Sequence, residues 1–471
     1  MAAMKTLASL ALALGLVISA GAAEPARTAA DIKAREIYAK IISIPSQLGN
    51  AKVPEVAEYL AGEFRAAGFP DGDIHILPFK GAGDQTASLV VRYKGTGKGG
   101  KPIVLMAHMD VVAAKREDWQ RDPYTLVEEN GYFFGRGTYD DKQGVASLTA
   151  TFLRLKAEKF VPSRDLIIYF SGDEETAQAS TRDAALNHRD LVDAEFALNA
   201  DSGGGALDDT GKALLFGFQT AEKTYADFKV TARNPGGHSS LPRPDNAIYE
   251  LADALLKVRA FKFPTMWNDT TVASFRQSGA THQDEMGAAL LKFAAHPGDP
   301  EAVAVIEKDP GFVGSIRTTC VATMLSGGHA ENALPQSASA NINCRIFPGV
   351  KIPDVRQVLQ GVVGDGLEVK LVTPELSSDP SPLRADLVAA VTRAVHTIHP
   401  GIPVVPVQAS GASDGLVFRA VGIPTYGVDG NFMQPKEDFS HGLNERLLVK
   451  SFYDSLTYWH ALLTDLAGKR R

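Results

Sequence analysis

The first 220 residues alternate between two hydrophobic patterns. Apolar residues three or four positions apart predict amphipathic helices, whereas short continuous apolar runs indicate buried strands. The predicted helices of this region are residues 29–42, 54–67 and 145–156. The predicted strands are residues 103–107, 166–170 and 196–198. Because strands that alternate with helices form βαβ units, we expect an α/β fold with a largely parallel sheet. The same texture returns after residue 383, with strand-like segments at residues 404–407 and 425–428.

The pattern between these two regions is different. Strands with alternating polar and apolar residues flank helical segments, in the order 225–232, 246–258, 317–324, 337–347, 354–363 and 367–371. This β-α-β-β-α-β order is typical of a ferredoxin-like domain. Residues 261–314 are too long for an ordinary connection and contain helical stretches, so we interpret them as an insertion.

Together these patterns predict a discontinuous architecture. An α/β domain formed by residues 24–220 and 377–471 is interrupted by a smaller domain at residues 221–376, which carries the insertion. The chain length of 471 residues agrees with two or three domains, because domains average about 150 residues.

Residues 1–23 are predicted to be a secretory signal peptide. Lys5 precedes an apolar run over residues 7–18, and small residues at positions 20–22 resemble a cleavage site. The alternative is an uncleaved anchor helix, but the run is shorter than the roughly 20 residues that span a bilayer. We therefore expect a secreted or periplasmic protein with no stable membrane insertion after signal removal.

Composition and charge narrow the range of partners. Apolar residues (45%) and charged residues (22%) lie near globular averages, and the net charge is −7. An acidic chain offers no general attraction for phosphate backbones, so we expect a small molecule or peptide as partner and no nucleic acid. The two cysteines, Cys320 and Cys344, are too few for a disulfide scaffold. Outside the cytoplasm they can form one disulfide or stay as buried thiols.

Side chains able to bind metal follow the predicted strands. The candidates are His108 and Asp110, the adjacent Asp140 and Asp141, the run Asp173, Glu174 and Glu175, the single Asp201, and the late His441. Each group has an ordinary explanation when taken alone, such as a helix N-cap for the adjacent aspartates. In an open α/β sheet, however, the carboxyl ends of the strands meet at one crevice. Two imidazoles and several carboxylates gathered there suit a pair of zinc ions.

A competing motif lies near the end of the chain. Residues 411–415 read Gly-Ala-Ser-Asp-Gly, which fits the G-x-S-x-G pattern of a serine nucleophile at Ser413. Asp429 or Asp438 and then His441 follow in the order of an α/β-hydrolase triad. Short patterns of this kind often arise by chance, and the motif leaves the upstream acidic clusters without a role. A serine hydrolase is therefore kept as an alternative.

In the order and spacing of these clusters, the chain resembles metallopeptidase family twenty. That group contains glutamate carboxypeptidase, carnosine dipeptidase, aminoacylase and succinyl-diaminopimelate desuccinylase. The resemblance covers nearly all of the chain after the signal peptide, and the carboxypeptidase S branch looks most similar. It implies a zinc-exopeptidase-like catalytic domain with an inserted lid domain. It also implies two divalent metal ions, with Zn²⁺ as the expected ion and Co²⁺ or Mn²⁺ as alternatives.

The resemblance also implies a role for each residue of the predicted metal centre. His108 and Asp201 would hold one ion, Glu175 and His441 the other, and Asp140 would bridge both. Asp110 would orient His108, and Glu174 would act as general base and acid. The family element is usually D-[DM]-K-G, whereas here Gln143 separates Lys142 from Gly144.

In the smaller domain, the resemblance implies residues that contact the substrate. His238, within Gly-Gly-His-Ser-Ser at residues 236–240, would stabilise the oxyanion, commonly across a dimer interface. Asn332 and Arg345 would bind the backbone and the carboxylate of the substrate, and Ser413 would line its site. A turn asparagine and a surface arginine are the ordinary alternatives. A guanidinium suits a carboxylate because its planar fork makes two parallel hydrogen bonds.

We therefore expect a metallo-exopeptidase or amidohydrolase, with a possible homodimer formed through the lid domain. A carboxylate held by Arg345 would restrict it to small peptides, as a carboxypeptidase or dipeptidase, or to N-acyl amino acids, as a deacylase. A secreted protein that traps peptides without cleaving them is a further alternative. Such a binder would not need Glu174 beside the metal ligands.

Overall fold

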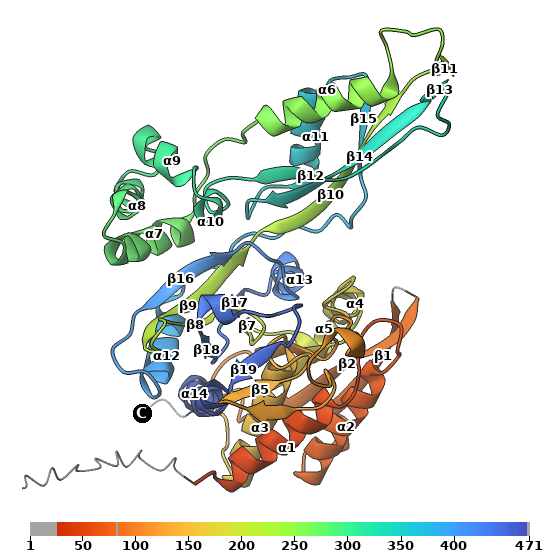
Figure 1. Cartoon of the computed structure of the whole chain (residues 1–471). Coiled ribbons are helices and arrows are strands. Elements are labelled where there is room, and N and C mark those ends of the chain that lie inside the picture. Colours follow the sequence, from red (N-terminus) through yellow and green to blue (C-terminus); the bar gives the residue numbers. More distant parts are fainter. Residues whose placement is uncertain (1–25, 82, 469–471) are drawn as a thin grey trace, which may run out of the picture.

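The computed structural model describes residues 26–81 and 83–468, and it consists of a large lobe and an elongated smaller lobe (Figure 1). The signal peptide expected over residues 1–23 lies outside the described residues. Within them, no helix is both long enough and apolar enough to cross a bilayer.

The large lobe is built on one mixed sheet. Its ten strands are β1 (Ile74–Gly81), β2 (Asp84–Tyr93), β3 (Ile103–His108), β6 (Leu166–Ser171), β7 (Phe196–Asn199), β8 (Gly204–Leu207), β9 (Ala213–Glu222), β16 (Val404–Ala409), β17 (Thr425–Gly427) and β18 (Phe432–Met433). They run in the order β1-β2-β6-β3-β7-β17-β9-β8-β18, and β16 pairs with β9.

The expectation of a largely parallel sheet holds in part, because parallel pairs form the centre and join β16 to β9 and β18 to β8, while the other pairs are antiparallel. The strands β6, β3, β7 and β17 pair in parallel. On one side β1 and β2 form an antiparallel hairpin that continues antiparallel onto β6, and on the other β9 pairs antiparallel with β17 and β8. Sequence analysis predicted neither the β1–β2 hairpin nor β8 and β9. β1 and β8 are half-buried and lack continuous apolar runs, whereas β2 and β9 are mostly buried, and the apolar run over residues 213–216 of β9 was overlooked.

Helices cover both faces of this sheet. They are α1 (Ala29–Ile42), α2 (Val53–Ala66), α3 (Lys142–Ala157), α4 (Ala179–Asn187), α5 (Arg189–Val192), α12 (Ala385–His396), α13 (Gly415–Ala420) and α14 (Val449–Ala467). One core contains Leu105 of β3 with residues of α1, α2, α3, α12 and α14. The other contains Val104 with residues of α4, α5 and α13. Burial on both faces explains why the central strands are continuously apolar in sequence.

Short elements complete the large lobe. They are a small sheet of β4 (Val127–Glu129), β5 (Tyr132–Phe134) and β19 (Arg446–Leu448), and 3₁₀ turns at Asp71–Asp73, Arg116–Asp118 and Pro435–Glu437.

The smaller lobe has the predicted β-α-β-β-α-β order. Its elements are β10 (Thr224–Arg233), α6 (Ala247–Ala260), β12 (Thr319–Gly327), β14 (Ser337–Ile346), α11 (Ile352–Val363) and β15 (Leu367–Leu371). The antiparallel sheet runs β12-β14-β10-β15. Its core packs alternate residues of β10, such as Phe228, against α6 and α11. Figure 1 shows these helices on the side of the sheet away from the large lobe, so the helix-free face is turned toward that lobe.

The predicted insertion is a helical unit beside the junction of the lobes. It contains α7 (Asp269–Thr281), α8 (Glu285–Ala295), α9 (Pro300–Ile306) and α10 (Pro310–Val313), and has its own core around Phe275, Leu290 and Phe293. Asn268 Nδ2, at the N-cap of α7, donates to Gln408 Oε1 of β16 at 3.2 Å. The insertion therefore contacts the large lobe as well as the smaller one.

Candidate metal centre

Three parallel strands bring the first candidates to one edge of the large sheet. His108 is the last residue of β3, Ser171 ends β6 and Asn199 ends β7. Because β3 pairs with both other strands, their carboxyl ends lie side by side. His108, Glu174, Glu175 and Asp201 consequently face the same crevice, as the strand-end argument predicts. Asp173, also a candidate from the sequence, does not: its carboxylate accepts the backbone N–H groups of Ala179 at 2.9 Å and Ser180 at 3.1 Å at the start of α4.

Asp140 and Asp141 reach this crevice from the N-terminal end of α3. A cis peptide bond joins them. Asp141 occupies the N-cap position, but its side chain makes no capping hydrogen bond. Instead, its Oδ2 accepts the backbone N–H of His108 at 3.2 Å. The carboxylate of Asp141 therefore binds the backbone of His108 in the crevice and does not cap α3.

The glutamine that departs from the family element leaves the turn intact. A Cβ at Gly144 would lie 2.4 Å from Asp141 Oδ1 and 2.9 Å from the Cβ of Ala200, so glycine is required one position later than the family places it. The carboxamide Nε2 of Gln143 donates to Asp141 Oδ1 at 3.2 Å and to Asp429 Oδ1 at 3.3 Å. Gln143 thus links two buried carboxylates at the back of the crevice.

The five side chains that the resemblance names as ligands lie together. Asp140 is central: its Oδ1 is 2.9 Å from His108 Nε2, and its Oδ2 is 3.0 Å from His441 Nε2. Asp201 Oδ1 lies 3.6 Å from His108 Nε2, and Glu175 Oε2 lies 2.9 Å from His441 Nε2. One carboxylate therefore stands between two groups, each of which contains one imidazole and one further carboxylate.

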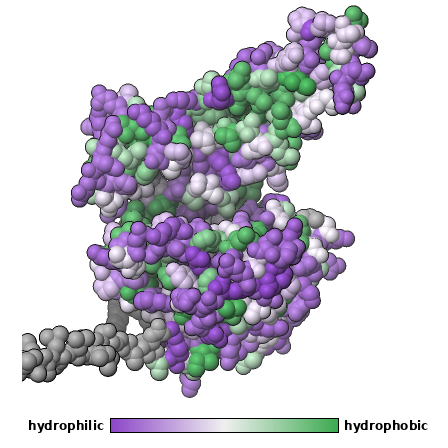
Figure 2. Space-filling view, in the orientation of Figure 1, coloured by the Kyte–Doolittle hydropathy of each residue, from purple (hydrophilic) through white to green (hydrophobic). Residues whose placement is uncertain are grey.

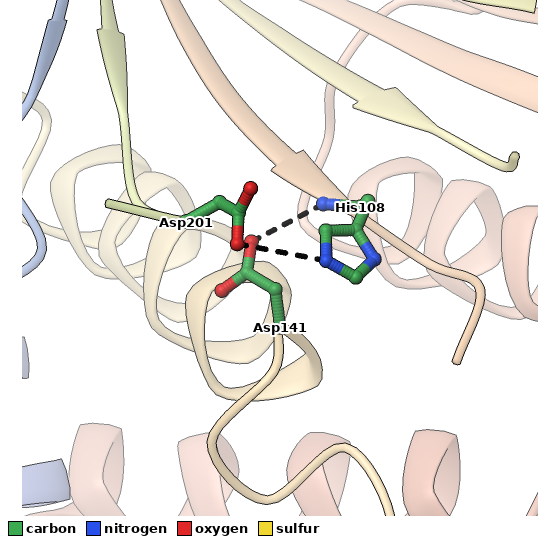
Figure 3. Close-up of side chains that lie close together, drawn as sticks. All are labelled: His108, Asp141 and Asp201. Atoms are coloured by element: carbon green, nitrogen blue, oxygen red, sulfur yellow. Dashed lines mark hydrogen bonds and ion pairs between the residues drawn. The ribbon is translucent and has the colours of Figure 1, made fainter. Parts of the chain in front are cut away.

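This donor set fits divalent cations. Ligand atoms of His108, Asp140 and Glu175 lie within 4.8 Å of one another, as do those of His108, Asp141 and Asp201 (Figure 3). Glu175 Oε1 is buried and has no hydrogen-bond partner among the described residues. A buried carboxylate oxygen without a donor is unfavourable unless a cation or water satisfies it. Imidazole nitrogen and carboxylate oxygen are both zinc ligands.

The crowding of charge shifts several pKa values. Burial, followed by the nearby charge of Asp201, raises the pKa of Glu174 well above its usual range. Burial also raises the pKa of Asp201, to about 6. Hydrogen bonds to Asp140 and Glu175 raise the pKa of His441 to about 10. Burial would raise the pKa of Asp140, but hydrogen bonds from His108 and His441 outweigh it and lower that pKa. Bound cations would relieve this repulsion between carboxylates.

Asp110 holds the acidic loop in place. Its Oδ1 and Oδ2 accept the backbone N–H groups of Glu174 at 3.2 Å and Glu175 at 3.1 Å. His108 Nδ1 lies 3.0 Å from the backbone oxygen of Asp110 and 3.5 Å from its Oδ1. The backbone of Asp110 is therefore the nearer partner of the imidazole, while its carboxylate positions the two glutamates.

Glu445 is a site residue that sequence analysis did not identify. Its buried Oε1 accepts the backbone N–H groups of Tyr139 at 2.8 Å and Asp140 at 3.0 Å. Arg136 pairs with Glu445 Oε2 at 2.5 Å and donates to the backbone oxygen of Gly442 at 3.1 Å. These contacts fix the His441 loop against the Asp140 loop. The partners of Glu445 lie about 300 positions earlier in the chain, so the sequence does not show that they meet. The one sequence signal is that Glu445 stands four positions after His441.

A cavity of about 310 Å³ opens beside these groups, and its lining includes Glu174, His441 and Ser413. The hydroxyl of Ser413 donates to Glu222 Oε2 at 2.9 Å. No histidine among the described residues forms a hydrogen bond with Ser413, and His441 pairs with Asp140 and Glu175 instead. The serine triad considered from the sequence is therefore not assembled, and Ser413 lies in the cavity wall.

The structure separates the candidates of the smaller lobe. His238, in β11 (Gly237–His238), pairs with β13 (Ala333–Leu334), and Ser239 N donates to Asn332 O at 3.0 Å. Figure 1 places β11 and β13 at the far tip of the lobe. Arg345 lies at the opposite end of β14, next to the junction with the large lobe. The ten residues of β14 span about 30 Å, so His238 and Asn332 do not approach the crevice within one chain.

Comparisons with known proteins agree with the geometry. Residues 104–465 match the model of peptidase family M20/M25/M40. The human N-fatty-acyl-amino acid synthase/hydrolase PM20D1 is 28% identical over 378 residues, which cover 78% of this chain and 74% of that protein. The probable carboxypeptidase S-like 2 of Dictyostelium discoideum is 25% identical over 405 residues, which cover 80% and 74%.

A solved structure extends the agreement to the fold. The M20 family metallo-carboxypeptidase Sso-CP2 of Sulfolobus solfataricus has a TM-score of 0.68 at 16% identity, over 92% of this chain and 98% of that one. This coverage includes both lobes. With most of its length matched by the family model, the chain belongs to peptidase family M20/M25/M40 and is a hydrolytic enzyme of the metallopeptidase type.

Proposed function

We propose that the protein is a dinuclear metal hydrolase that cleaves the amide bond of small peptides or N-acyl amino acids with a free carboxylate. The observation that carries this proposal is the place of Asp140 between two imidazoles. His108 and Asp201 would hold one ion, Glu175 and His441 the other, and Asp140 both. Zn²⁺ suits this mixture of ligands best, with Co²⁺ or Mn²⁺ as substitutes.

Glu174 is proposed as the general base and acid. When bound, the metal ions supply Lewis acidity and make hydroxide available near neutral pH. Glu174 would accept the proton of the attacking water and deliver it to the leaving amine. Its backbone is held by Asp110, its Oε1 accepts from Gln178 Nε2 at 2.9 Å, and it lines the cavity beside the metal ligands.

Arg345 is proposed to bind the carboxylate of the substrate. An internal peptide bond offers no such anion, so cleavage would be confined to chain ends, small peptides and N-acyl amino acids. The names of the human and Dictyostelium relatives describe an acyl-amino acid enzyme and a carboxypeptidase, respectively. Both substrate classes are therefore included in the proposal, the second as the carboxypeptidase or dipeptidase type.

Residues 221–376 are proposed as a lid domain, inserted between the catalytic segments 24–220 and 377–471, that pairs with a second copy of the chain. The edge strand β12 contains neither a charged residue nor a proline, and Leu325 is 70% exposed. The neighbouring helix α6 exposes Ile248 and Leu256. Figure 2 shows an apolar area on this lobe around α6. The ladder of β12 shifts register between Ala322 and Met324, but an edge without charged residues or proline still pairs readily with another strand.

Twofold pairing of two β12 edges would also bring His238 and Asn332, at the tip of the smaller lobe, to the metal centre of the other chain. In an antiparallel pair about a twofold axis, the tip of one sheet lies beside the junction end of the other. His238 and Asn332 of one copy would then approach the metal centre of its partner. His238 would stabilise the negative charge that develops on the carbonyl oxygen, as an oxyanion donor.

A secreted or periplasmic location is part of the proposal. Cys320 of β12 and Cys344 of β14 form a disulfide. Such bonds persist outside the reducing cytoplasm and are rare within it. This agrees with the signal peptide expected from residues 1–23.

Metal removal and a substrate panel test the proposal. The purified protein is stripped with a chelator, reloaded with Zn²⁺, Co²⁺ or Mn²⁺, and assayed on dipeptides and N-acyl amino acids. We expect activity to disappear on stripping and to return with two ions per chain. Undiminished hydrolysis after stripping, together with covalent labelling of Ser413, would instead support a serine hydrolase. Peptide binding without turnover in the reloaded protein would support a binding protein.

A further inference from the structure

Arg345 is held without a carboxylate partner. Among the described residues, its guanidinium makes neither an ion pair nor a hydrogen bond. It lies over the ring of Tyr225, with Cζ 4.8 Å from the ring centroid. The two residues are direct partners in the β10–β14 ladder. Stacking on an aromatic face stabilises the cation and leaves the N–H donors free for an anion in the plane of the guanidinium.

Tyr225 is itself fixed by a hydrogen-bonded carboxylate. Its hydroxyl donates to Asp227 Oδ2 at 2.6 Å. The other oxygen, Oδ1, accepts from Asn341 Nδ2 at 2.8 Å and from Asn343 Nδ2 at 2.9 Å. Burial opposes the charge of Asp227, but the hydrogen bonds from Tyr225, Asn343 and Asn341, followed by the charge of Arg345, outweigh it and lower the pKa of Asp227. The carboxylate is therefore ionised and occupied at both oxygens.

Asp227 lies near Arg345 but forms no ion pair with it. Residues 225, 227, 343 and 345 share one face of the sheet, since alternate residues of a strand point to the same side and Tyr225 faces Arg345 in the register. Asp227 and Arg345 are diagonal neighbours, a spacing that long side chains can bridge. No ion pair forms between them, although the charge of Arg345 contributes to lowering the pKa of Asp227.

The same end of the lid sheet carries a second cation. Lys223 is 1% exposed, and its Nζ donates to the backbone oxygen of Arg317 at 3.0 Å and to Thr319 Oγ1 at 3.3 Å. Burial, followed by the charge of Arg345, lowers the pKa of Lys223 to about 8. Among the described residues, neither cation forms an ion pair. The local field therefore favours an anion from outside the chain.

This cationic end lies next to the proposed active site. Glu222 lines the cavity that contains the metal ligands, and Tyr225 follows three residues later on a continuous path from β9 into β10. Three residues of extended chain span about 10 Å. The face that bears Tyr225 and Arg345 is the helix-free face, which is turned toward the large lobe (Figure 1).

We propose that Tyr225, fixed by Asp227, is a positioning residue that presents the guanidinium of Arg345 to the carboxylate of the substrate. The ring supports the guanidinium from one face and holds its N–H donors toward the cleft. This inference rests on the proposed function, since it requires a substrate with a free carboxylate. Tyr225 would not touch the reacting atoms and would act through Arg345.

The experiment compares variants on a matched pair of substrates, an N-acyl amino acid and its C-terminal carboxamide. Tyr225→Leu removes the ring, and Tyr225→Phe keeps it while losing the hydrogen bond to Asp227. We expect Tyr225→Leu to raise KM for the acid about fivefold with kcat nearly unchanged, and to leave KM for the amide unchanged. Tyr225→Phe should recover most of the loss. If the amide is not cleaved, its Ki as a competitive inhibitor replaces its KM.

Two further variants make the outcome decisive. Lys229→Met is the control, because Lys229 lies on the same strand and face but farther from the junction; it should leave both substrates unaffected. Arg345→Met should abolish the preference for the acid. If Arg345→Met does so and Tyr225→Leu does not, the positioning role is wrong and the proposed function stands. If Arg345→Met retains the preference, the proposed carboxylate recognition fails as well. Tyr225 is 40% exposed, so its truncation leaves no buried cavity.

Discussion

At the scale of single residues, two carboxylates hold the loops that carry the proposed metal ligands. Asp110 accepts backbone N–H groups of the acidic loop, and Glu445 accepts those of Tyr139 and Asp140. His108 and Asp201 could be proposed from the sequence because His108 ends, and Asp201 follows, a recognisable buried strand. The carboxylate contacts of Asp110 could not, since nothing in the sequence specifies which backbone N–H groups a carboxylate will meet. Glu445 was missed for the same reason: its partners come from a loop about 300 positions away.

The role of Glu174 can be tested by removing its charge alone. Glu174→Gln keeps the size of the side chain and can still meet Gln178, but its amide cannot accept a proton from water. We expect kcat to fall by about 10²–10⁴-fold, the usual contribution of a general base, with two metal ions per chain retained. Turnover and metal content are measured on the same preparation. The exposed Glu117→Gln is the control, and a near-normal kcat in Glu174→Gln would remove this residue from the mechanism.

A second prediction concerns Asp110, whose carboxylate holds two consecutive backbone N–H groups of the acidic loop. Asp110→Ala should release the loop that carries Glu175 and weaken metal binding about 10- to 100-fold, as is typical when a partner of the ligands is lost. Competition with a chromophoric chelator measures the affinity directly, without relying on activity. Asp118→Ala, at an exposed aspartate nearby, should bind metal as the unmodified protein does. Equal affinities in the two variants would show that Asp110 has no such role.

At the scale of elements, the smaller lobe was the easiest part to predict. Its strands alternate polar and apolar residues because one face packs on helices, so β15 begins and ends where the pattern changes, at Leu367–Leu371. The strands β4, β5, β11 and β13 escaped prediction because two or three residues establish no period. Sequence also left open whether the two cysteines pair, since this depends on the register that places Cys320 opposite Cys344.

The disulfide gives a stability prediction for the lid. It closes a loop between positions 24 residues apart and ties the edge strand β12 to β14. A double Cys320→Ser, Cys344→Ser variant should lose roughly 2–4 kcal/mol of unfolding free energy, the usual effect of removing such a cross-link. Denaturant titrations with and without a reductant measure the loss. The reductant should destabilise the unmodified protein and leave the serine variant unchanged; if neither responds, the bond contributes nothing to stability.

At the scale of the whole molecule, sequence order predicted a chain that leaves the large lobe and returns to it, but not how far the lid residues would lie from the metal centre. The family resemblance placed His238 and Asn332 among the substrate contacts. The structure places them at the tip of the smaller lobe, about 30 Å along β14 from the end that carries Arg345. Distances of this size arise from the sheet as a whole, and local patterns carry no information on them.

This separation yields a test of whether two chains build each active site. Glu174→Gln and His238→Ala should each inactivate the homodimer. Glu174→Gln removes the general base, and His238→Ala removes the oxyanion donor. In a heterodimer of the two variants, one site would combine an intact Glu174 with an intact His238 from the other chain. We therefore expect the purified heterodimer, isolated through two different affinity tags, to recover about half of the unmodified activity, because one of its two equivalent sites is complete.

If His238 acted within its own chain, every site of that heterodimer would still lack one of the two groups, and no activity would return. A monomer at assay concentrations, shown by light scattering, would give the same negative result for a different reason, so the mass must be measured alongside. Recovery of activity requires both a dimer and exchange of the lid tip between chains. Such recovery would agree with twofold pairing of the exposed β12 edges, which places the tip of one smaller lobe beside the junction end of the other.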